Sequence, residues 1–153
     1  GRHGEQMAVF ASQVKIDGKP LSEMNLSNER WEEIKHDTVQ GGSRIIKLRG
    51  RSSFQSPAYN AVKMIEAAMG GEKFTLPAGC YVNDDRLGFK NVMMAMPTTI
   101  DKTGVHYDLP TGTEEEMAAL KASYEHLCKM RDEIVTLGII PPVADWKKDN
   151  VNL

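Results

Sequence analysis

The chain has 153 residues, 41% of them hydrophobic, which is enough for one domain with a hydrophobic core. Nineteen Lys and Arg against twenty-one Asp and Glu give a formal charge of −2, which argues against nucleic acid as a partner. Cys80 and Cys128 match neither a disulfide framework nor a metal-ligand spacing, and no apolar run reaches the roughly eighteen residues that span a membrane. We therefore expect a cytoplasmic globular protein without a metal or a membrane partner.

The N-terminal segment places a histidine beside a glycine and a carboxylate, in Arg2-His3-Gly4-Glu5. A histidine with a pKa of about 6.5 can exchange a proton near neutral pH, and glycine lets a ligand approach the backbone. On residue types alone the segment is either a catalytic site or a solvated turn. Because the chain starts without an initiator methionine, we expect it to be part of a longer polypeptide.

The next segments predict a strand, a tight turn and a helix. Residues 7–16 are apolar and then alternate, which indicates a strand, and Asp17-Gly18 is typical of a turn with positive φ. Ser27 is the expected N-cap of a helix that extends to Leu48. Gly41-Gly42 interrupts its period, which predicts either one kinked helix or two in tandem.

The segment from Arg49 to Tyr59 joins this helix to a second one. Gly50 is expected to end the first helix in the left-handed conformation, and Ser56 before Pro57 is expected to cap the second. Serines at a helix N-terminus either hold a carboxylate or phosphate, or act only as caps. The second helix is expected to stop at Gly70-Gly71. It has a stripe of small and medium apolar residues, which predicts a contact with the core or with another subunit. The stripe consists of Ala58, Ala61, Val62, Ile65 and Met69.

The remaining chain predicts antiparallel strands and a long helix. One strand is expected at residues 74–82, near a sheet edge because of Pro77. Another is expected at residues 92–100, and it forms a hairpin with a return strand at residues 105–107. Residues 83–86 are interpreted as a solvated polar turn. Thr113 and Glu116 form a capping box for a helix that ends at Gly138. His36 is assigned to the surface and His106 to a structural role.

This order of parts resembles the C-terminal domain of the lactate and malate dehydrogenases over nearly all 153 residues. His3-Gly4-Glu5 matches the family's histidine-glycine-acid signature, and residues 49–53 match its glycine-x-serine/threonine segment. The serine-rich segment and the continuation Gly4-Glu5-Gln6-Met7 are similar to the malate branch. The resemblance implies an α+β fold in which an antiparallel sheet packs with long helices, and a single catalytic and dimerisation domain over residues 1–153.

For function, the resemblance implies reversible oxidation of a small 2-hydroxy acid by NAD, with malate and oxaloacetate as the substrate pair. His3 would be the catalytic acid/base, and Ser52 would lie beside both substrate and nicotinamide. Ser56 and Pro57 would border the nicotinamide. The family also implies a homodimer or homotetramer formed through the helices near 27–48 and 56–69.

Several family features are missing from this chain. No glycine-rich dinucleotide loop occurs, so the NAD-binding Rossmann domain is not expected here. The aspartate partner of the histidine, the arginine that binds the substrate carboxylate and the mobile loop that selects the substrate also precede this region in the family. We therefore expect the fragment alone to be inactive. The alternatives are a domain of a dehydrogenase for lactate or another 2-hydroxy acid, and a non-catalytic oligomerisation module of the same fold.

Overall fold

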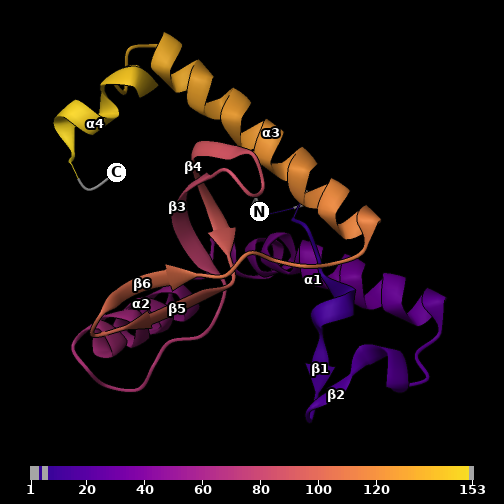
Figure 1. Ribbon diagram of the computed structural model, residues 1–153. Helices are drawn as coiled ribbons and strands as arrows, with labels where there is room; N and C mark the ends of the chain where they lie inside the picture. The colour runs from indigo at the N-terminus through magenta and orange to yellow at the C-terminus, as the bar shows by residue number, and fades with distance from the viewer. Residues whose placement is uncertain (1–3, 5–6, 152–153) are drawn as a thin grey trace.

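The computed structural model describes Gly4 and residues 7–151. These described residues form three antiparallel β-hairpins and three long helices, arranged as in Figure 1, so the predicted α+β class is confirmed. The elements in chain order are β1 (Lys15–Ile16), β2 (Lys19–Pro20), α1 (Asn28–Arg49), α2 (Gln55–Ala68), β3 (Ala78–Asp84), β4 (Phe89–Met96), β5 (Thr98–Asp101), β6 (Gly104–Tyr107), α3 (Glu114–Thr136) and α4 (Trp146–Asp149). Short 3-10 turns lie at Ala11–Gln13, Leu21–Glu23 and Val143–Asp145.

The main core lies between the β3–β4 hairpin and α3, which runs beside that hairpin in Figure 1. Alternate residues of β3 and β4 face α3, where Leu120 is buried. The buried members of this core are Cys80, Val82, Phe89, Val92, Met94, Met96 and Leu120. A smaller core of Ala67, Phe74, Ala78 and Ile100 joins α2 to β5. Burial of these apolar side chains therefore holds α3 and α2 against separate hairpins.

The predicted helix starts and stops are largely confirmed. The hydroxyl of Ser27 accepts a hydrogen bond from the N–H of Arg30 at 3.2 Å, and α1 continues through Gly41-Gly42 as one helix. The Thr113–Glu116 capping box opens α3, and Gly138, with φ of 69°, follows its end. These ends are set by nearby residues, which explains why sequence patterns located them.

The predicted strand over residues 7–16 is wrong. Residues 11–13 form a 3-10 turn, and only Lys15–Ile16 pairs as β1. The N–H and hydroxyl of Ser12 donate to the carboxylate of Glu116, at 2.9 and 2.5 Å. This contact with α3 favours a turn where the alternating pattern alone favours an extended strand. The turn predicted at Asp17-Gly18 is confirmed, since φ is 50° and 81° at these two residues.

Two strand predictions and one turn prediction need correction. Pro77 excludes Phe74 from β3, although Phe74 still pairs with Ile100 in an isolated bridge. The single strand predicted over residues 92–100 is split by Pro97 into β4 and β5. Residues 83–86 are not a fully solvated turn, because Asp84 is only 8% exposed and pairs with Arg86. The hairpin through residues 101–104 is confirmed as β5–β6.

The apolar stripe predicted on α2 does not form the core. Val62, Ile65 and Met69 are exposed by 61%, 64% and 83%, whereas Ala67 is completely buried. The buried side of α2 is therefore the side that carries Ala67, because this small residue lets Phe74 and Ile100 approach the helix closely. Subunit contact, the other interpretation of the stripe, stays a prediction.

Candidate functional site

The connection between α1 and α2 and the first turn of α2 hold three of the predicted site residues. Gly50 ends α1 with φ of 70°, and its N–H donates to the carbonyl of Ile46 at 2.8 Å, as predicted. A hydrogen bond of 3.1 Å from Nη1 of Arg49 to Oε1 of Gln55 spans the connection. The result is a short loop, residues 50–54, that presents Ser52 between two helix ends.

Ser52, Ser56 and Pro57 are all exposed on this connection and the first turn of α2. The carbonyl of Ser56 accepts a local hydrogen bond from Nδ2 of Asn60 at 3.0 Å. The Ser52 and Ser56 hydroxyls form no hydrogen bond with a side chain or backbone group in the described part of the chain. Both hydroxyls are thus available to a ligand.

Ser56 does not cap α2, which corrects the sequence prediction. The helix begins one residue earlier, at Gln55, so that Ser56 already lies within its first turn. Phe54 occupies the N-cap position with φ of −120°, and it has no side-chain acceptor to offer. The first amides of α2 therefore receive no side-chain cap, and they carry the partial positive charge of a helix N-terminus.

The predicted acid/base, His3, lies outside the described residues. Its neighbour Gly4 has φ of 98°, a conformation that favours glycine, and the N–H of Met7 donates to the Gly4 carbonyl at 3.0 Å. The glycine in the histidine-glycine-acid segment is thus required by the backbone turn. Of the other histidines assigned from sequence, His36 is exposed, and His106 bonds the Thr103 hydroxyl through Nε2 at 2.9 Å.

A large apolar cavity of about 870 Å³ lies apart from the α1–α2 connection. Its walls come from the segment at Met7 and Phe10, from β4, from α3 and from residues 108–111. Leu120 and Leu127 contribute the α3 side. Sequence reasoning missed this cavity because its walls come from segments far apart in the chain, and the methionines of residues 93–96 were its only local signal.

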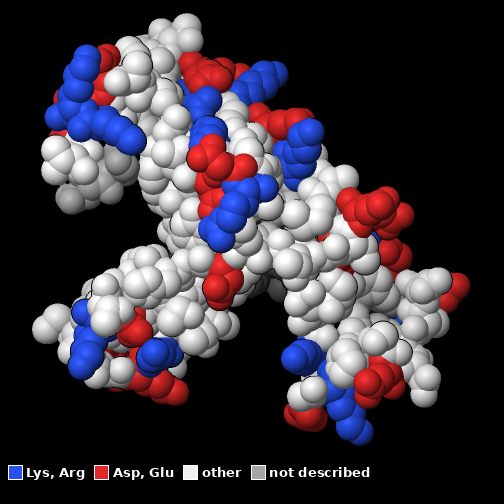
Figure 2. Space-filling model, in the orientation of Figure 1, with Lys and Arg blue, Asp and Glu red and all other residues white. Residues whose placement is uncertain are grey.

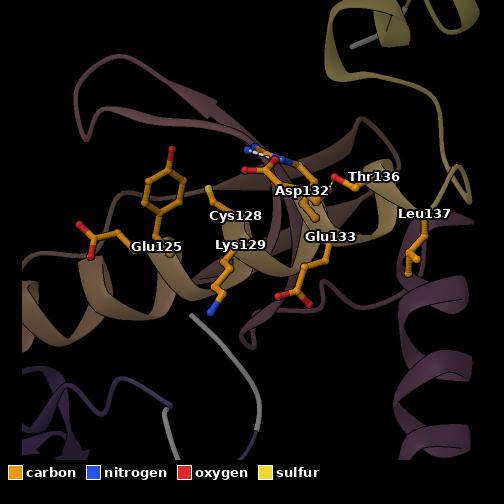
Figure 3. A pocket seen from close by; sticks show the side chains of 9 residues that line it. Glu125, Cys128, Lys129, Asp132, Glu133, Thr136 and Leu137 are labelled. Atoms are coloured by element: carbon orange, nitrogen blue, oxygen red, sulfur yellow. Dashed lines mark hydrogen bonds and ion pairs between the residues drawn. The ribbon is translucent and has the colours of Figure 1, made fainter.

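A second cavity, of about 810 Å³, follows the C-terminal half of α3 and is shown in Figure 3. Its lining residues all fall between 124 and 137, so one helix and its end form the whole surface. Figure 3 shows Lys129 and Glu133 pointing to one side of α3, with Cys128 and Asp132 on the other. Burial raises the pKa of the neighbouring Tyr124 phenol. The arrangement is an open, charged helix surface.

The described residues offer neither a metal centre nor a membrane-spanning helix. Within Gly4 and residues 7–151, no three His, Cys, Asp or Glu side chains are grouped so as to hold a metal ion. No helix in the same ranges has the length and apolar character needed to cross a membrane. The exposed hydroxyls and uncapped amides at the α1–α2 connection thus remain the candidate site, and their chemistry suits an anionic ligand.

Comparison with known proteins identifies the fold family. Residues 1–137 match the model of the lactate/malate dehydrogenase alpha/beta C-terminal domain. The malate dehydrogenase of Pelagibacter ubique is 34% identical over 147 residues, which cover 88% of this chain and 46% of that protein. The chain belongs to the lactate/malate dehydrogenase family and corresponds to its C-terminal domain.

Solved structures of both branches of the family are similar to this chain. The malate dehydrogenase of Plasmodium falciparum in complex with NADH has a TM-score of 0.78 and 26% identity, covering 90% of this chain and 46% of that one. The lactate dehydrogenase of Cryptosporidium parvum, complexed with lactic acid and NAD, has a TM-score of 0.78 and 28% identity, covering 88% and 44%. This chain therefore spans less than half the length of the relatives it matches.

Proposed function

We propose that this chain is the catalytic and subunit-contact half of a cytoplasmic, NAD-dependent malate dehydrogenase, which interconverts (S)-malate and oxaloacetate. The observation that carries the proposal is the 34% identity with a malate dehydrogenase over 147 residues. The match to the family model begins at residue 1, so it includes the histidine-glycine-acid segment. Two free cysteines support a reducing compartment.

In this proposal His3 exchanges the proton of the substrate. Its imidazole accepts the hydroxyl proton of malate during oxidation and returns a proton to the carbonyl oxygen of oxaloacetate during reduction. NAD, when bound, supplies the hydride acceptor. A histidine suits this role because its ordinary pKa lies near neutral pH, so both protonation states are accessible.

Ser52 is proposed to lie beside the substrate and the nicotinamide, with Ser56 and Pro57 bordering the nicotinamide. The exposed Ser52 and Ser56 hydroxyls and the uncapped first turn of α2 fit this role, because each offers hydrogen-bonding groups not used by a described side chain. Ser52 either donates to the ligand or keeps the pocket small. Most of the dinucleotide is expected to bind a Rossmann domain outside this chain, so the fragment alone is expected to be inactive.

The proposal is tested by His3→Asn in a full-length enzyme that contains this domain. Turnover of malate and oxaloacetate should be abolished, while NAD binding, followed by calorimetry, should be largely retained. His36→Asn is the matched control, because His36 is exposed on α1 and should leave turnover unchanged. Retained turnover in His3→Asn would contradict the assignment of His3.

Lactate is a second candidate substrate, because a lactate dehydrogenase with lactic acid bound is among the similar structures. The substrate-selecting loop of the family does not fall within this chain. Steady-state rates on oxaloacetate and pyruvate separate the two candidates, and we expect oxaloacetate to be preferred. A preference for pyruvate would move the chain to the lactate branch.

A non-catalytic oligomerisation module is the alternative from another functional class. The exposed apolar side chains of α2 favour subunit contact whether or not the protein is an enzyme. The polypeptide upstream of this domain separates these alternatives. A glycine-rich loop followed by an Asp-x-x-Arg segment supports the enzyme, and their absence supports the module.

A further inference from the structure

The C-terminal segment of the chain lies beyond the part that matches the family model, which ends at residue 137. Gly138 follows α3 with φ of 69°, and Pro141-Pro142 prevents the helix from resuming. Figure 1 shows the chain reversing direction after α3, so that α4 returns towards β3. We call residues 139–151 the C-terminal strap.

The strap is held together by hydrogen bonds within itself. The indole N–H of Trp146 donates to the carbonyl of Pro141 at 2.8 Å, and Nζ of Lys148 donates to Oδ1 of Asp145 at 2.6 Å. In the described part of the chain, residues 141–149 form hydrogen bonds and ion pairs only with other residues of the strap. The strap is therefore a local unit whose internal bonds do not depend on the sheet.

A contact between two aromatic rings joins the strap to the β3–β4 hairpin. The rings of Trp146 and Tyr81 lie 6.3 Å apart, centre to centre, and are tilted by 54°, a favourable geometry for an aromatic pair. Trp146 is half-buried, whereas residues 147–149 after it are exposed. Tyr81 lies on the face of β3 turned away from α3, where it is half-buried although Gly79 and Asn83 on the same face are exposed. Trp146 thus covers Tyr81 on the outer face of the hairpin.

Tyr81 is itself fixed by the neighbouring strand. Its hydroxyl donates to Oδ1 of Asn91 at 2.6 Å, and Asn91 has φ of 51° at the point where the register of the hairpin shifts. Nη1 of Arg131 on α3 donates to the Asn91 carbonyl at 2.9 Å. Because β4 and α3 set the position of Tyr81, the contact with Trp146 can break without a rearrangement of the core.

We infer that the C-terminal strap is a detachable cover of the outer face of the β3–β4 hairpin, closed by the contact between Trp146 and Tyr81. A segment held by one ring contact opens at a small cost in free energy, far below the cost of unfolding the core. Opening exposes both rings, so the strap controls access to Tyr81 on this face. The strap lies beyond the family domain, and this role is independent of the proposed function.

Tryptic cleavage within the strap measures its opening in the full-length protein. Figure 2 shows basic side chains at the surface over α4, and Lys147 and Lys148 are the two that α4 contains. When opening is fast relative to cleavage, the cleavage rate follows the population of the open strap. Tyr81→Ala should raise this rate about 3- to 10-fold, the range for loss of one aromatic pair, whereas Tyr81→Phe keeps the ring and should change it less than about twofold. Mass spectrometry identifies the cleavage sites.

Trp146→Leu removes the same contact from the strap and leaves the sheet intact, so it decides the outcome if Tyr81→Ala does not fold. Its cleavage rate, divided by that of a synthetic peptide of residues 141–151 with the same change, should rise by a similar factor. Tyr59→Ala is the matched control, because Tyr59 is a 64% exposed aromatic residue on α2 and should leave cleavage of the strap unchanged.

Three results would overturn the inference. The first is an unchanged cleavage rate in Trp146→Leu or in folded Tyr81→Ala. The second is an equal increase in Tyr59→Ala. The third is a parallel increase of cleavage after Lys90 in Trp146→Leu, because Lys90 lies in β4 and its cleavage would report opening of the hairpin itself.

Discussion

Asp84 is the buried carboxylate on which the end of β3 depends. It is 8% exposed, and its Oδ2 accepts from Nη2 of Arg86 at 2.6 Å, while Oδ1 accepts from the Arg86 backbone N–H at 2.8 Å. The side-chain hydrogen bond from Arg86 lowers the pKa of Asp84 from 3.8 to about 2, against the opposing effect of burial. Asp84, which the sequence predicted as part of a solvated polar turn, thus forms an ion pair with Arg86 at the end of the β3–β4 hairpin.

The stability of the fold should depend on the ionisation of Asp84. Because its pKa is lower in the folded state, its contribution is present above about pH 4 and is lost as the pH falls towards 2. We expect Asp84→Asn to lower the free energy of unfolding near pH 6, and the difference from the unmodified protein to shrink as the pH approaches 2. Urea denaturation at a series of pH values measures this difference.

Arg86→Gln provides the second arm of this experiment, because it removes the main cause of the lowered pKa but keeps the carboxylate. The free-energy difference should again shrink towards pH 2. A difference that stays constant from pH 6 to pH 2 in both variants would show that the Asp84–Arg86 pair does not contribute to acid stability.

At the scale of elements, the start of α3 is tied to the N-terminal segment by one side chain. Glu116 completes the capping box by accepting from the Thr113 N–H at 2.8 Å, and the same carboxylate accepts from the Ser12 N–H and hydroxyl. Burial opposes its ionisation, but the hydrogen bonds from Ser12 and Thr113 outweigh this and lower its pKa. A Cβ at Gly112 would lie 2.5 Å from Oε2 of Glu116 and 2.7 Å from Cδ1 of Phe10, so a side chain there would displace Glu116 or Phe10.

Removing this carboxylate should cost more than removing the cap hydroxyl. We expect Thr113→Ala to lower the free energy of unfolding by about 1 kcal/mol, the usual cost of losing an N-cap. Glu116→Ala should cost about 2 kcal/mol, because bonds to both α3 and the N-terminal segment are lost. Glu115→Ala on the same turn is the control, with an expected change within about 0.5 kcal/mol. Urea denaturation is the measurement, and equal costs for Thr113→Ala and Glu116→Ala would contradict the tie to Ser12.

Local sequence patterns correctly predicted elements whose ends are set by neighbouring residues. The same patterns failed where contacts with residues distant in the sequence determine the backbone conformation. Ser27, Gly50 and Thr113 act at the positions expected from sequence. The strand predicted over residues 7–16 failed because Glu116 holds Ser12 from 104 positions away. Ser56 was misplaced because α2 begins with an aromatic N-cap, for which there is no polar signal.

The candidate site was accessible from sequence only through family resemblance. From spacing and composition alone, His3 was either catalytic or part of a solvated turn, and the serines either bound a ligand or capped a helix. Only the order of elements, through the family resemblance, favoured site roles for these residues. The structure places Ser52, Ser56 and Pro57 around one connection, while their roles and that of His3 stay predictions.

At the scale of the whole molecule, α1 and α2 expose large apolar side chains that the described part of the chain does not cover. No residue of α1 is buried, and Ile46 and Leu48 are 47% and 79% exposed. On α2, Val62 and Ile65 are similarly exposed. Exposed apolar side chains on two consecutive helices are typical of an interaction surface, and a symmetric contact between two copies would bury the same side chains on both. We therefore propose that α1 and α2 form the contact in a homodimer or homotetramer.

Val62→Asp should weaken this contact, because it places two charges near each other in the buried centre of a symmetric interface. Sedimentation equilibrium should show the association weakened by at least about tenfold, the change expected when an interface loses more than about 1.4 kcal/mol. Val105→Asp on β6 is the matched control, since Val105 is 59% exposed but lies outside these helices. An unchanged association in Val62→Asp, or an equal loss in Val105→Asp, would mean that α1 and α2 do not form the subunit contact.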